Sequence, residues 1–594
     1  MSERSSSFLV APWFEIPSLR RWGQASDAVG ILHRYSLTLD LLLQNFLDSL
    51  QPPGGQSPGD LPVELGYTVS INIYDLFSKN SSGQWQFDTA RMEFFIDLFR
   101  RVERPVVVNL RANHFVGEDP LVGELMAHES SFARLNDGSP VKEIYYSNAV
   151  FAPNFSLDES LPLNRYRFEG FRRAAAILAE FDRWHPGVIR AVTLAGELHH
   201  FLPELANPMA AGQFENVRMT DYSAESVRDF AAWLQPRHHT VAQLNERFGT
   251  AFASWEEIEP PRWNLRVRND APAWSHIDSY ANGCLPVFGW VRPPVTGSLT
   301  VYLDGVPVGQ AEYGLSRLDV YDAVPGLADS DVGFRFDLDY RRIAPGRHVL
   351  HVVLENEPGR RFLVGDRRIV IARHFGQEPE SLHPAPDLSA LYSLPPCVER
   401  GEGFAWLDQP PHDLVLCFNP YAAEWQEFRE HQVEALLLKF AQLAVTAGIA
   451  PEKLYSHQIM PQFEGSWNRV AFAVPARPPA NSPYSPGIDL YGGAAVYRGL
   501  PQFLQGSRYA VPEMHPRMGK RISRDVFLRA LQYHRDLGAT FISPYFMALR
   551  EPLGQRTTAD PANLQDALLI HPLNIGVGSL FFYSAIIKFL NSDC

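Results

Sequence analysis

Strand-like apolar runs alternate with helix-like segments along most of the chain. Eight such runs are predicted strands, at residues 66–74, 105–115, 143–151, 188–197, 413–419, 453–459, 508–513 and 539–546. Amphipathic helices are predicted between them, most clearly at residues 90–101, 164–184, 223–235, 424–447 and 523–537. This alternation is typical of α/β proteins with a parallel sheet, and eight units predict a (β/α)8 TIM barrel. The reacting groups of such a barrel lie at the carboxyl ends of its strands.

Residues 286–373 follow a different period. Asp304 and Gly305 form a hairpin turn between two runs of alternating apolar and polar residues, and further short strands of the same kind follow. A segment of this length matches one immunoglobulin-like β-sandwich. We therefore predict a sandwich inserted after the fourth barrel unit, which divides the barrel between residues 1–285 and 374–594.

The charge balance argues against one class of ligand. The chain has 594 residues, with 53 Lys and Arg against 67 Asp and Glu, and a formal net charge of −14. Affinity for nucleic acids depends mainly on Lys and Arg that neutralise phosphates, so we do not expect a nucleic-acid partner.

The sequence shows no targeting signal, no membrane-spanning segment and no cysteine pair with metal-binding spacing. No apolar stretch reaches the ~20 residues that cross a bilayer, and the apolar run near the N-terminus is too short for a secretory signal. The 4 cysteines lie far apart, which fits neither a zinc site nor a disulfide framework. We expect a cytoplasmic protein without a membrane partner, a metal or another cofactor. A homo-oligomer is compatible with the sequence.

Two predicted strands end in a glutamate. Strand four ends in Ala195-Gly196-Glu197, followed by His199, and strand seven ends in Glu513. Either glutamate alone is equally well explained as a cap or an ion pair. Together, across the mouth of a barrel, two carboxyl groups are what glycosidic cleavage requires, because one protonates the leaving oxygen and the other acts at the anomeric carbon.

The pair on strands four and seven resembles the arrangement of clan A glycoside hydrolases. The segment TDYSAESVRDFAAWLQPRHHTVAQLNERFGTAFASWEEI (220–258) resembles the region after the acid/base glutamate of family 42 β-galactosidases. The resemblance implies a retaining hydrolase of a β-linked glycoside or oligosaccharide, with a β-galactoside as first candidate. Glu197 would be the general acid/base and Glu513 the nucleophile. The clan usually has Asn before the acid/base, in contact with the sugar 2-hydroxyl, whereas this chain has Gly196.

Polar and aromatic residues near the predicted strand ends are the candidates for binding a carbohydrate. They are Arg111, Asn113, His114, His199, Asn419, Tyr455, His457, Glu464, Trp467, His515 and Tyr545, with Trp13 and Glu15 at one side of the mouth. The resemblance implies that Arg111 and Tyr455 contact the nucleophile. Aromatic faces such as that of Trp467 stack on sugar rings, although a loop Trp is more often simply packed. Arg111 also has a structural explanation as an interior ion pair, and Asn113 and His114 as parts of a turn.

Two other functions stay open. A barrel that binds carbohydrate, or takes part in polysaccharide assembly, without turnover is suggested only by Gly196. A metal-dependent hydrolase is suggested by His114, Glu197, His199 and His200, since His and Glu are zinc ligands. Adjacent histidines on a strand point to opposite sides, so His199 and His200 could bind one ion only after a turn.

Overall fold

The computed structural model of the chain describes most of its length. The described residues are 7–14, 28–51, 62–113, 120–145, 148–200, 219–268, 270–357, 360–375, 404–475, 477, 479, 481–490, 496–516, 523–549, 568–574 and 578–591.

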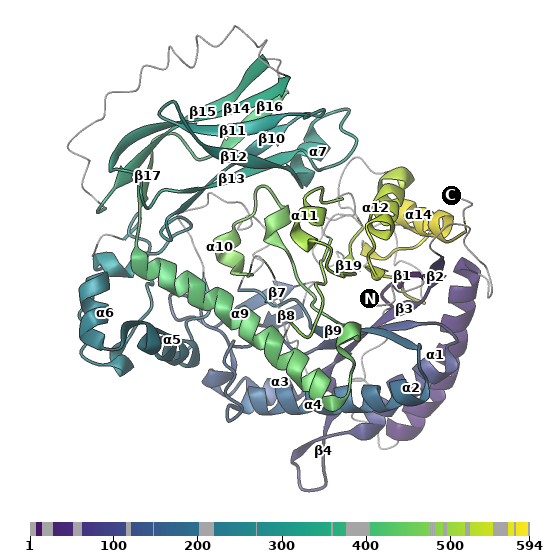
Figure 1. Cartoon of the computed structure of the whole chain (residues 1–594). Helices are drawn as coiled ribbons and strands as arrows, with labels where there is room; N and C mark the ends of the chain where they lie inside the picture. The colour runs from purple at the N-terminus through teal and green to yellow at the C-terminus, as the bar shows by residue number, and fades with distance from the viewer. Residues whose placement is uncertain are drawn as a thin grey trace.

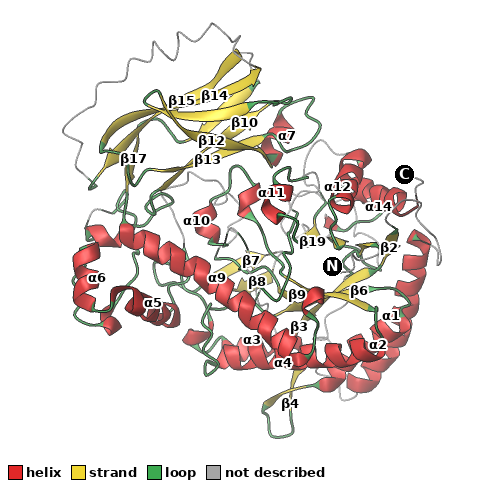
Figure 2. Cartoon of the chain, viewed as in Figure 1, coloured by secondary structure: helices red, strands yellow, loops and turns green. Residues whose placement is uncertain are grey.

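Eight parallel strands or extended segments close into a barrel. In spatial order they are β1 (Phe8–Val10), β3 (Tyr67–Asn72), β6 (Val106–Arg111), β9 (Ile189–Ala195), β18 (Leu454–Tyr455), the extended segment 485–490, β19 (Val511–Met514) and β20 (Phe541–Pro544). Figures 1 and 2 show some of these strands, among them β3 and β9, with helices around them. The sheet pairings are continued by backbone hydrogen bonds: Phe14 N donates to Thr68 O at 2.9 Å, Ser456 N to Ser485 O at 3.0 Å and Leu490 N to Glu513 O at 2.8 Å. The predicted α/β barrel is confirmed.

Small and apolar side chains fill the lower part of the barrel. Strand β6 reads VVVNLR, and the first five of its residues are buried. Such nearly continuous apolar runs are typical of parallel strands that are covered on both faces. The interior cluster consists of Leu9, Ala11, Val107, Ala191, Tyr455, Ala510 and Phe541. The barrel is therefore a packed core, and polar side chains gather above it, at the carboxyl ends of the strands.

Helices follow the strands and cover the barrel. They are α1 (Ala28–Leu50), α2 (Thr89–Arg101), α3 (Pro120–Leu125), α4 (Pro162–Trp184), α5 (Ala224–His238), α6 (Val241–Phe248), α9 (Pro420–Ala447), α10 (Arg469–Phe472), α11 (Leu500–Leu504), α12 (Arg524–Asp536) and α14 (Ser579–Asn591). Each of the five helices predicted most clearly is present. Phe171 of α4 packs on Phe440 of α9 with ring centroids 4.8 Å apart, and Gly448 ends α9 with φ of 105°.

A second, mostly antiparallel sheet lies at one end of the molecule (Figure 1). Its strands are β10 (Cys284–Val291), β11 (Ser298–Leu303), β12 (Val306–Leu315), β13 (Gly333–Asp339), β14 (Gly346–Glu357), β15 (Arg360–Ala372), β16 (Ala405–Gln409) and β17 (Leu414–Cys417), in the order β16-β10-β13-β12-β11-β14-β15-β17. Helix α7 (Leu318–Ala323) lies within this unit, which has its own hydrophobic core. We call residues 284–417 the β-unit.

Two predicted barrel strands belong elsewhere. Residues 413–419 contain β17, which pairs with β15 in the β-unit, so this prediction is wrong. Residues 143–151 contain the antiparallel hairpin of β7 (Lys142–Tyr145) and β8 (Asn148–Phe151) instead of a barrel strand. Their places are taken by β1 and segment 485–490, which the apolar pattern did not mark. Short strands β2 (Val63–Leu65), β4 (Phe77–Lys79) and β5 (Trp85–Phe87) complete the described strands.

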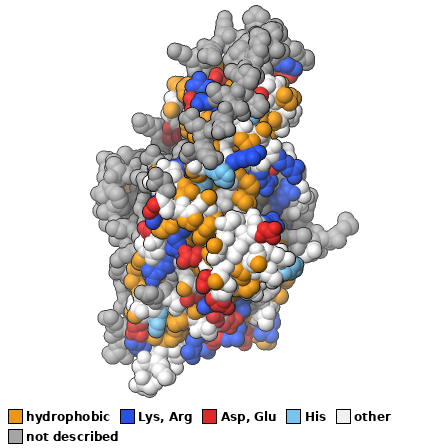
Figure 3. All heavy atoms as spheres, turned by 90° about the vertical axis from the view of Figure 1, so that its left-hand side faces the viewer, with side chains coloured by type: hydrophobic (Ala, Val, Ile, Leu, Met, Phe, Trp, Pro, Cys, Tyr) orange, Lys and Arg blue, Asp and Glu red, His pale blue; other side chains and the backbone are white. Residues whose placement is uncertain are grey.

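Among the described residues, no helix is both long and apolar enough to span a bilayer. On the face in Figure 3, acidic and basic side chains are interspersed between scattered hydrophobic ones. Charge on this face is thus mixed, although the whole chain has a net charge of −14.

Candidate active site

Glu197 stands in a turn directly after barrel strand four. Strand β9 ends at Ala195, where φ is 63°, and Gly196 follows with φ of 87°. Glycine adopts this left-handed conformation without the strain that a Cβ atom adds. The turn buries Glu197, whose exposed fraction is 8%. Gly196 therefore has a backbone reason to be present where clan A usually has Asn.

Glu513 lies on strand seven between two imidazoles. The Nε2 atom of His457 lies 3.1 Å from Oε2 of Glu513, and Nε2 of His515 hydrogen-bonds Oε1. His515 and Glu513 are two residues apart on one strand, so their side chains leave the backbone on the same side. His457 follows strand five, which segment 485–490 separates from strand seven. The structure thus gives each carboxylate oxygen of Glu513 its own histidine.

These hydrogen bonds favour the ionised form of Glu513. Burial alone would raise its pKa, but the hydrogen bonds from His457 and His515 lower the pKa well below the ordinary value for glutamate. A carboxylate that stays ionised near neutral pH can act as a nucleophile.

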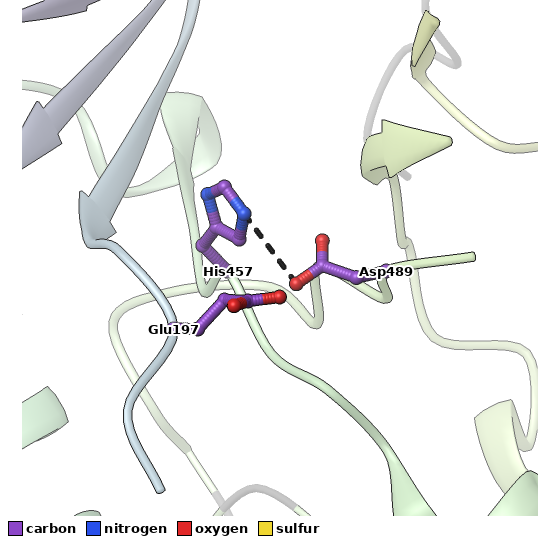
Figure 4. Close-up of side chains that lie close together, drawn as sticks. All are labelled: Glu197, His457 and Asp489. Carbon is purple, nitrogen blue, oxygen red and sulfur yellow. Dashed lines mark ion pairs between the residues drawn. The ribbon is translucent and has the colours of Figure 1, made fainter. Parts of the chain in front are cut away.

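Asp489 is the main residue of the site that sequence reasoning missed. It lies in segment 485–490, and its exposed fraction is 2%. Figure 4 shows its carboxyl group turned toward that of Glu197, with His457 beside both. One donor atom each of Glu197, His457 and Asp489 lie within 4.8 Å of one another, and His457 Nε2 lies 3.4 Å from Oδ2 of Asp489. The pattern Ile488-Asp489-Leu490, an acid between two buried apolar residues, was the available signal.

Asp489 holds its proton more strongly than an ordinary aspartate. Burial raises its pKa well above the usual value, and the neighbouring carboxyl groups of Glu197 and Glu513 raise it further. The site therefore combines a carboxyl group whose pKa is lowered, that of Glu513, with one whose pKa is raised, that of Asp489 beside Glu197. Carboxyl groups whose environments push their pKa values apart are typical of acid and base pairs in enzymes.

Aromatic rings surround the histidines. His515 stacks on Tyr545 with centroids 4.6 Å apart, and Trp13 packs edge-on against Tyr545 at 5.7 Å and His457 at 5.9 Å. The indole nitrogen of Trp13 donates to Pro512 O at 2.7 Å, which ties it to β19. The structure thus brings Trp13, His457, His515 and Tyr545 together around Glu513.

Tyr455 points into the barrel but lies below the site. Its hydroxyl donates to Thr540 Oγ1 at 2.9 Å, its ring packs edge-on against Phe541, and it belongs to the interior cluster. Thr540 precedes β20, so this contact is at the amino ends of the strands. His457, two residues further along, points the same way and reaches the mouth.

Other predicted binding residues have structural contacts. Asn113 accepts a hydrogen bond from the buried guanidinium of Arg167. Asn419 caps α9 by accepting from Tyr421 N at 3.1 Å, and its amide donates to Trp274 O and His276 O at 2.8 and 2.7 Å. All hydrogen-bonding groups of the Asn419 side chain are therefore used within the protein.

Glu464 and Trp467 face the β-unit. Glu464 pairs with Ser316 of the β-unit in an isolated bridge, and its burial raises the pKa to about 8. The ring of Trp467 stacks on Phe472 with centroids 5.2 Å apart, and its backbone oxygen accepts from Arg335 at 2.7 Å. These contacts favour packing roles at the boundary between barrel and β-unit.

Arg111 ends β6, in register with Ala195 of β9, and so lies at the same edge as Glu197. The ring of His199 packs near Phe472 at 5.7 Å. His200 stacks on Phe155 at 3.9 Å, and its ring nitrogens bond Thr220 and the Arg429 carbonyl. His114 and Glu15 lie outside the described residues.

The site has donors that could surround an ion, but their hydrogen bonds serve another purpose. Both ring nitrogens of His200 are engaged with Thr220 and Arg429, so His200 is not available to an ion beside Glu197. His114, another member of the predicted metal set, lies outside the described residues. Glu513 is ionised and can only accept, so Nε2 of His457 carries the proton between them. Imidazole binds a metal through a nitrogen that carries no proton. The protonated Nε2 of His457 therefore has no lone pair to offer a metal.

The family model described as β-galactosidase, of glycoside hydrolase family 42, matches residues 212–275. The match contains the segment 220–258 and begins after Glu197. The resemblance to family 42 is confirmed. It indicates an enzyme that hydrolyses O-glycosyl bonds. In the structure, this segment forms α5 and α6 and packs on α9, with the rings of Phe230 and Trp425 4.9 Å apart.

Solved glycosidase structures are similar only at a distance. The catalytic domain of β-amylase from Paenibacillus polymyxa is 9% identical, with a TM-score of 0.45 over 92% of this chain and 93% of that one. A β-galactosidase from Bacillus circulans sp. alkalophilus is 9% identical, with a TM-score of 0.41 over 93% of this chain, which spans 52% of that protein. No curated protein matches the sequence.

Proposed function

We propose that the chain is a retaining glycoside hydrolase in which Glu513 is the nucleophile and Glu197 the general acid/base. The observation that carries this proposal is that each carboxylate oxygen of Glu513 has its own imidazole partner, which favours the ionised form, while the carboxyl groups of Glu197 and Asp489 lie together beside His457. Glu197 and Glu513 follow strands four and seven of the barrel, the positions from which the prediction began.

The two steps use these groups in turn. In the first, Glu513 forms a bond to the anomeric carbon, the glycosidic C–O bond breaks, and the leaving oxygen takes a proton from Glu197. In the second, Glu197 removes a proton from water, whose oxygen replaces Glu513 at the anomeric carbon. The sugar leaves with the configuration that it had in the substrate.

The substrate is a β-linked glycoside or oligosaccharide, and a β-galactoside is the first candidate. This choice rests on the family 42 match at residues 212–275. The rings of Trp13 and Tyr545, close to the nucleophile, offer apolar surface for the C–H face of a sugar. His457, His515 and Arg111 supply polar groups at the same edge.

The architecture around the site is part of the proposal. We infer that the β-unit is an inserted immunoglobulin-like sandwich, as predicted for residues 286–373 between barrel parts 1–285 and 374–594. Its separate core and its place between α6 and α9 support this. Its predicted end is too early, because β16 and β17 pair with β10 and β15 of the β-unit. We also propose a cytoplasmic location, with which the free thiols of Cys284 and Cys417 agree.

A panel of nitrophenyl glycosides tests the function. Wild type should hydrolyse at least one β-glycoside, and Glu197→Gln and Glu513→Gln should each lose about 10³-fold in kcat or more. Azide should restore turnover to Glu513→Ala with a glycosyl azide of inverted configuration. Unchanged hydrolysis in both Gln variants would contradict the assignment, and a wild type that binds sugars without turnover would favour the non-catalytic alternative.

A further inference from the structure

Asp489 has a buried carboxyl group without a structural partner of the usual kind. Neither Oδ1 nor Oδ2 accepts a hydrogen bond from the backbone or from a neutral side chain among the described residues. Its backbone is held in the barrel, because Asp489 N donates to Gln458 O at 3.0 Å. A buried carboxyl group costs free energy unless it is paired or neutral, so a site that keeps one requires an explanation.

Two carboxyl groups lie near Asp489, those of Glu197 and Glu513, and both have a proposed catalytic role. Figure 4 shows Asp489 and Glu197 turned toward each other, and Glu513 is linked to Asp489 through the shared neighbour His457. The pKa of Tyr497 is raised by burial and by the acids Glu464, Asp331 and Asp489. Among the described residues, the groups that raise the pKa of Asp489 besides its burial are the carboxyl groups of Glu197 and Glu513.

Two carboxyl groups this close cannot both be ionised at low cost. Like charges at such a distance in a buried site raise the affinity for one proton, which the two groups then share. The shared proton also satisfies both groups, because the protonated carboxyl donates to the ionised one.

We propose that Asp489 is a positioning residue that shares one proton with Glu197 and so keeps the general acid protonated at neutral pH. This inference rests on the function proposed above. Because Glu513 becomes a neutral ester as the pair releases its proton to the leaving oxygen, the three carboxyl groups keep the same total charge through the first step. The negative charge moves from Glu513 to the pair, and the repulsion within the pair then favours the return of a proton from the attacking water in the second step.

The pH dependence of kcat/KM tests this role. In wild type the basic limb reports loss of the shared proton. Asp489→Asn keeps the size of the side chain but leaves Glu197 without the like charge that holds this proton, so the basic limb should move to lower pH by about one unit or more. KM should change little, whereas kcat should fall on the basic side. A merely structural role would lower activity equally at all pH values.

Asp331→Asn is the matched control. Asp331 is also a fully buried acid, and its pKa is raised to about 7, but it is not among the groups that shift Asp489. The basic limb of kcat/KM of Asp331→Asn should therefore lie at the same pH as that of wild type. A limb that moves equally in both variants, or in neither, would overturn the proposal.

A second measurement does not depend on turnover. The infrared difference spectrum of wild type minus Asp489→Asn at pH 7 should contain the C=O band of a protonated carboxyl group, and its absence would overturn the proposal. If wild type hydrolyses no glycoside but the band is present, the proposed function fails while the shared proton stands. Stoichiometric binding of Zn²⁺ to wild type that is lost in Asp489→Asn would assign the group to a cation instead.

Discussion

The Nε2 atom of His457 lies 3.1 Å from Oε2 of Glu513, although the two residues come from strands five and seven of the barrel. Segment 485–490, which carries Asp489, lies between these strands. The side chain of His457 therefore extends across this segment to reach Glu513. One imidazole therefore contacts Glu513, whose pKa is lowered, and at 3.4 Å also Asp489, whose pKa is raised.

Replacing His515 should weaken the ionised form of Glu513. His515→Phe keeps a ring on Tyr545 but removes the donor to Oε1, so the pKa of Glu513 should rise. The nucleophile must be ionised, so the acidic limb of kcat/KM should move to higher pH, by about one unit. Tyr545→Phe keeps the stacking partner and the histidine, and its acidic limb should stay where it is in wild type. Equal acidic limbs in all three proteins would show that His515 does not set the pKa.

Tyr455 should matter for stability and not for turnover. Tyr455→Phe removes the hydroxyl that donates to Thr540 below the site, and about 1 kcal/mol of unfolding free energy should be lost. The kcat/KM of the folded enzyme should stay within about twofold of wild type. His457→Phe, the same kind of change two residues on, should instead reduce kcat strongly. A loss of kcat in Tyr455→Phe equal to that in His457→Phe would contradict this prediction and show that Tyr455 acts in the active site.

Local patterns predicted the helices and the positions of Glu197 and Glu513 at strand ends, because each depends on a short stretch of chain. Helix α4 starts at Pro162, two residues before its predicted start, and α9 ends before Gly448 as expected. Glu197 and Glu513 were assigned to the correct strands, four and seven, only because one missed strand and one falsely predicted strand cancelled before each of them. The hairpin at 143–151 was counted where β1 was missed, and β17 was counted where segment 485–490 was missed.

The missed strands have physical reasons. Strand β1 has three residues, and segment 485–490 is joined to its neighbours mainly by backbone hydrogen bonds that leave no apolar run in the sequence. Strand β17 is as apolar as a barrel strand, and only its pairing with β15 decides the sheet to which it belongs. Tertiary pairing therefore overrode the local pattern, and Asp489 was hidden with its strand.

Asn419 should act as a helix cap. Asn419→Ala removes the acceptor for Tyr421 N and two donors to backbone carbonyls, so unfolding free energy should fall by roughly 2 kcal/mol. Asn419→Ser keeps a capping oxygen and should lose less. Denaturant unfolding of both variants measures the difference. A change in KM for a glycoside without a change in stability would instead support the predicted role in substrate binding.

Asp331 should make the stability of the fold depend on pH. It is fully buried, accepts from Val496 N at 3.2 Å, and has a pKa that burial, together with the nearby charge of Asp329, raises from 3.8 to about 7. Between these pH values the unfolded chain is ionised at this residue while the folded chain keeps its proton, so the folded state loses stability as pH rises. The unfolding free energy of wild type relative to Asp331→Asn should therefore fall by on the order of 4 kcal/mol from pH 4 to pH 8.

Urea unfolding at a series of pH values measures this difference. Asp329→Asn removes the acid that raises the pKa of Asp331 and should reduce the fall without abolishing it. If the curves of wild type and Asp331→Asn run parallel from pH 4 to pH 8, Asp331 does not retain its proton in the folded protein.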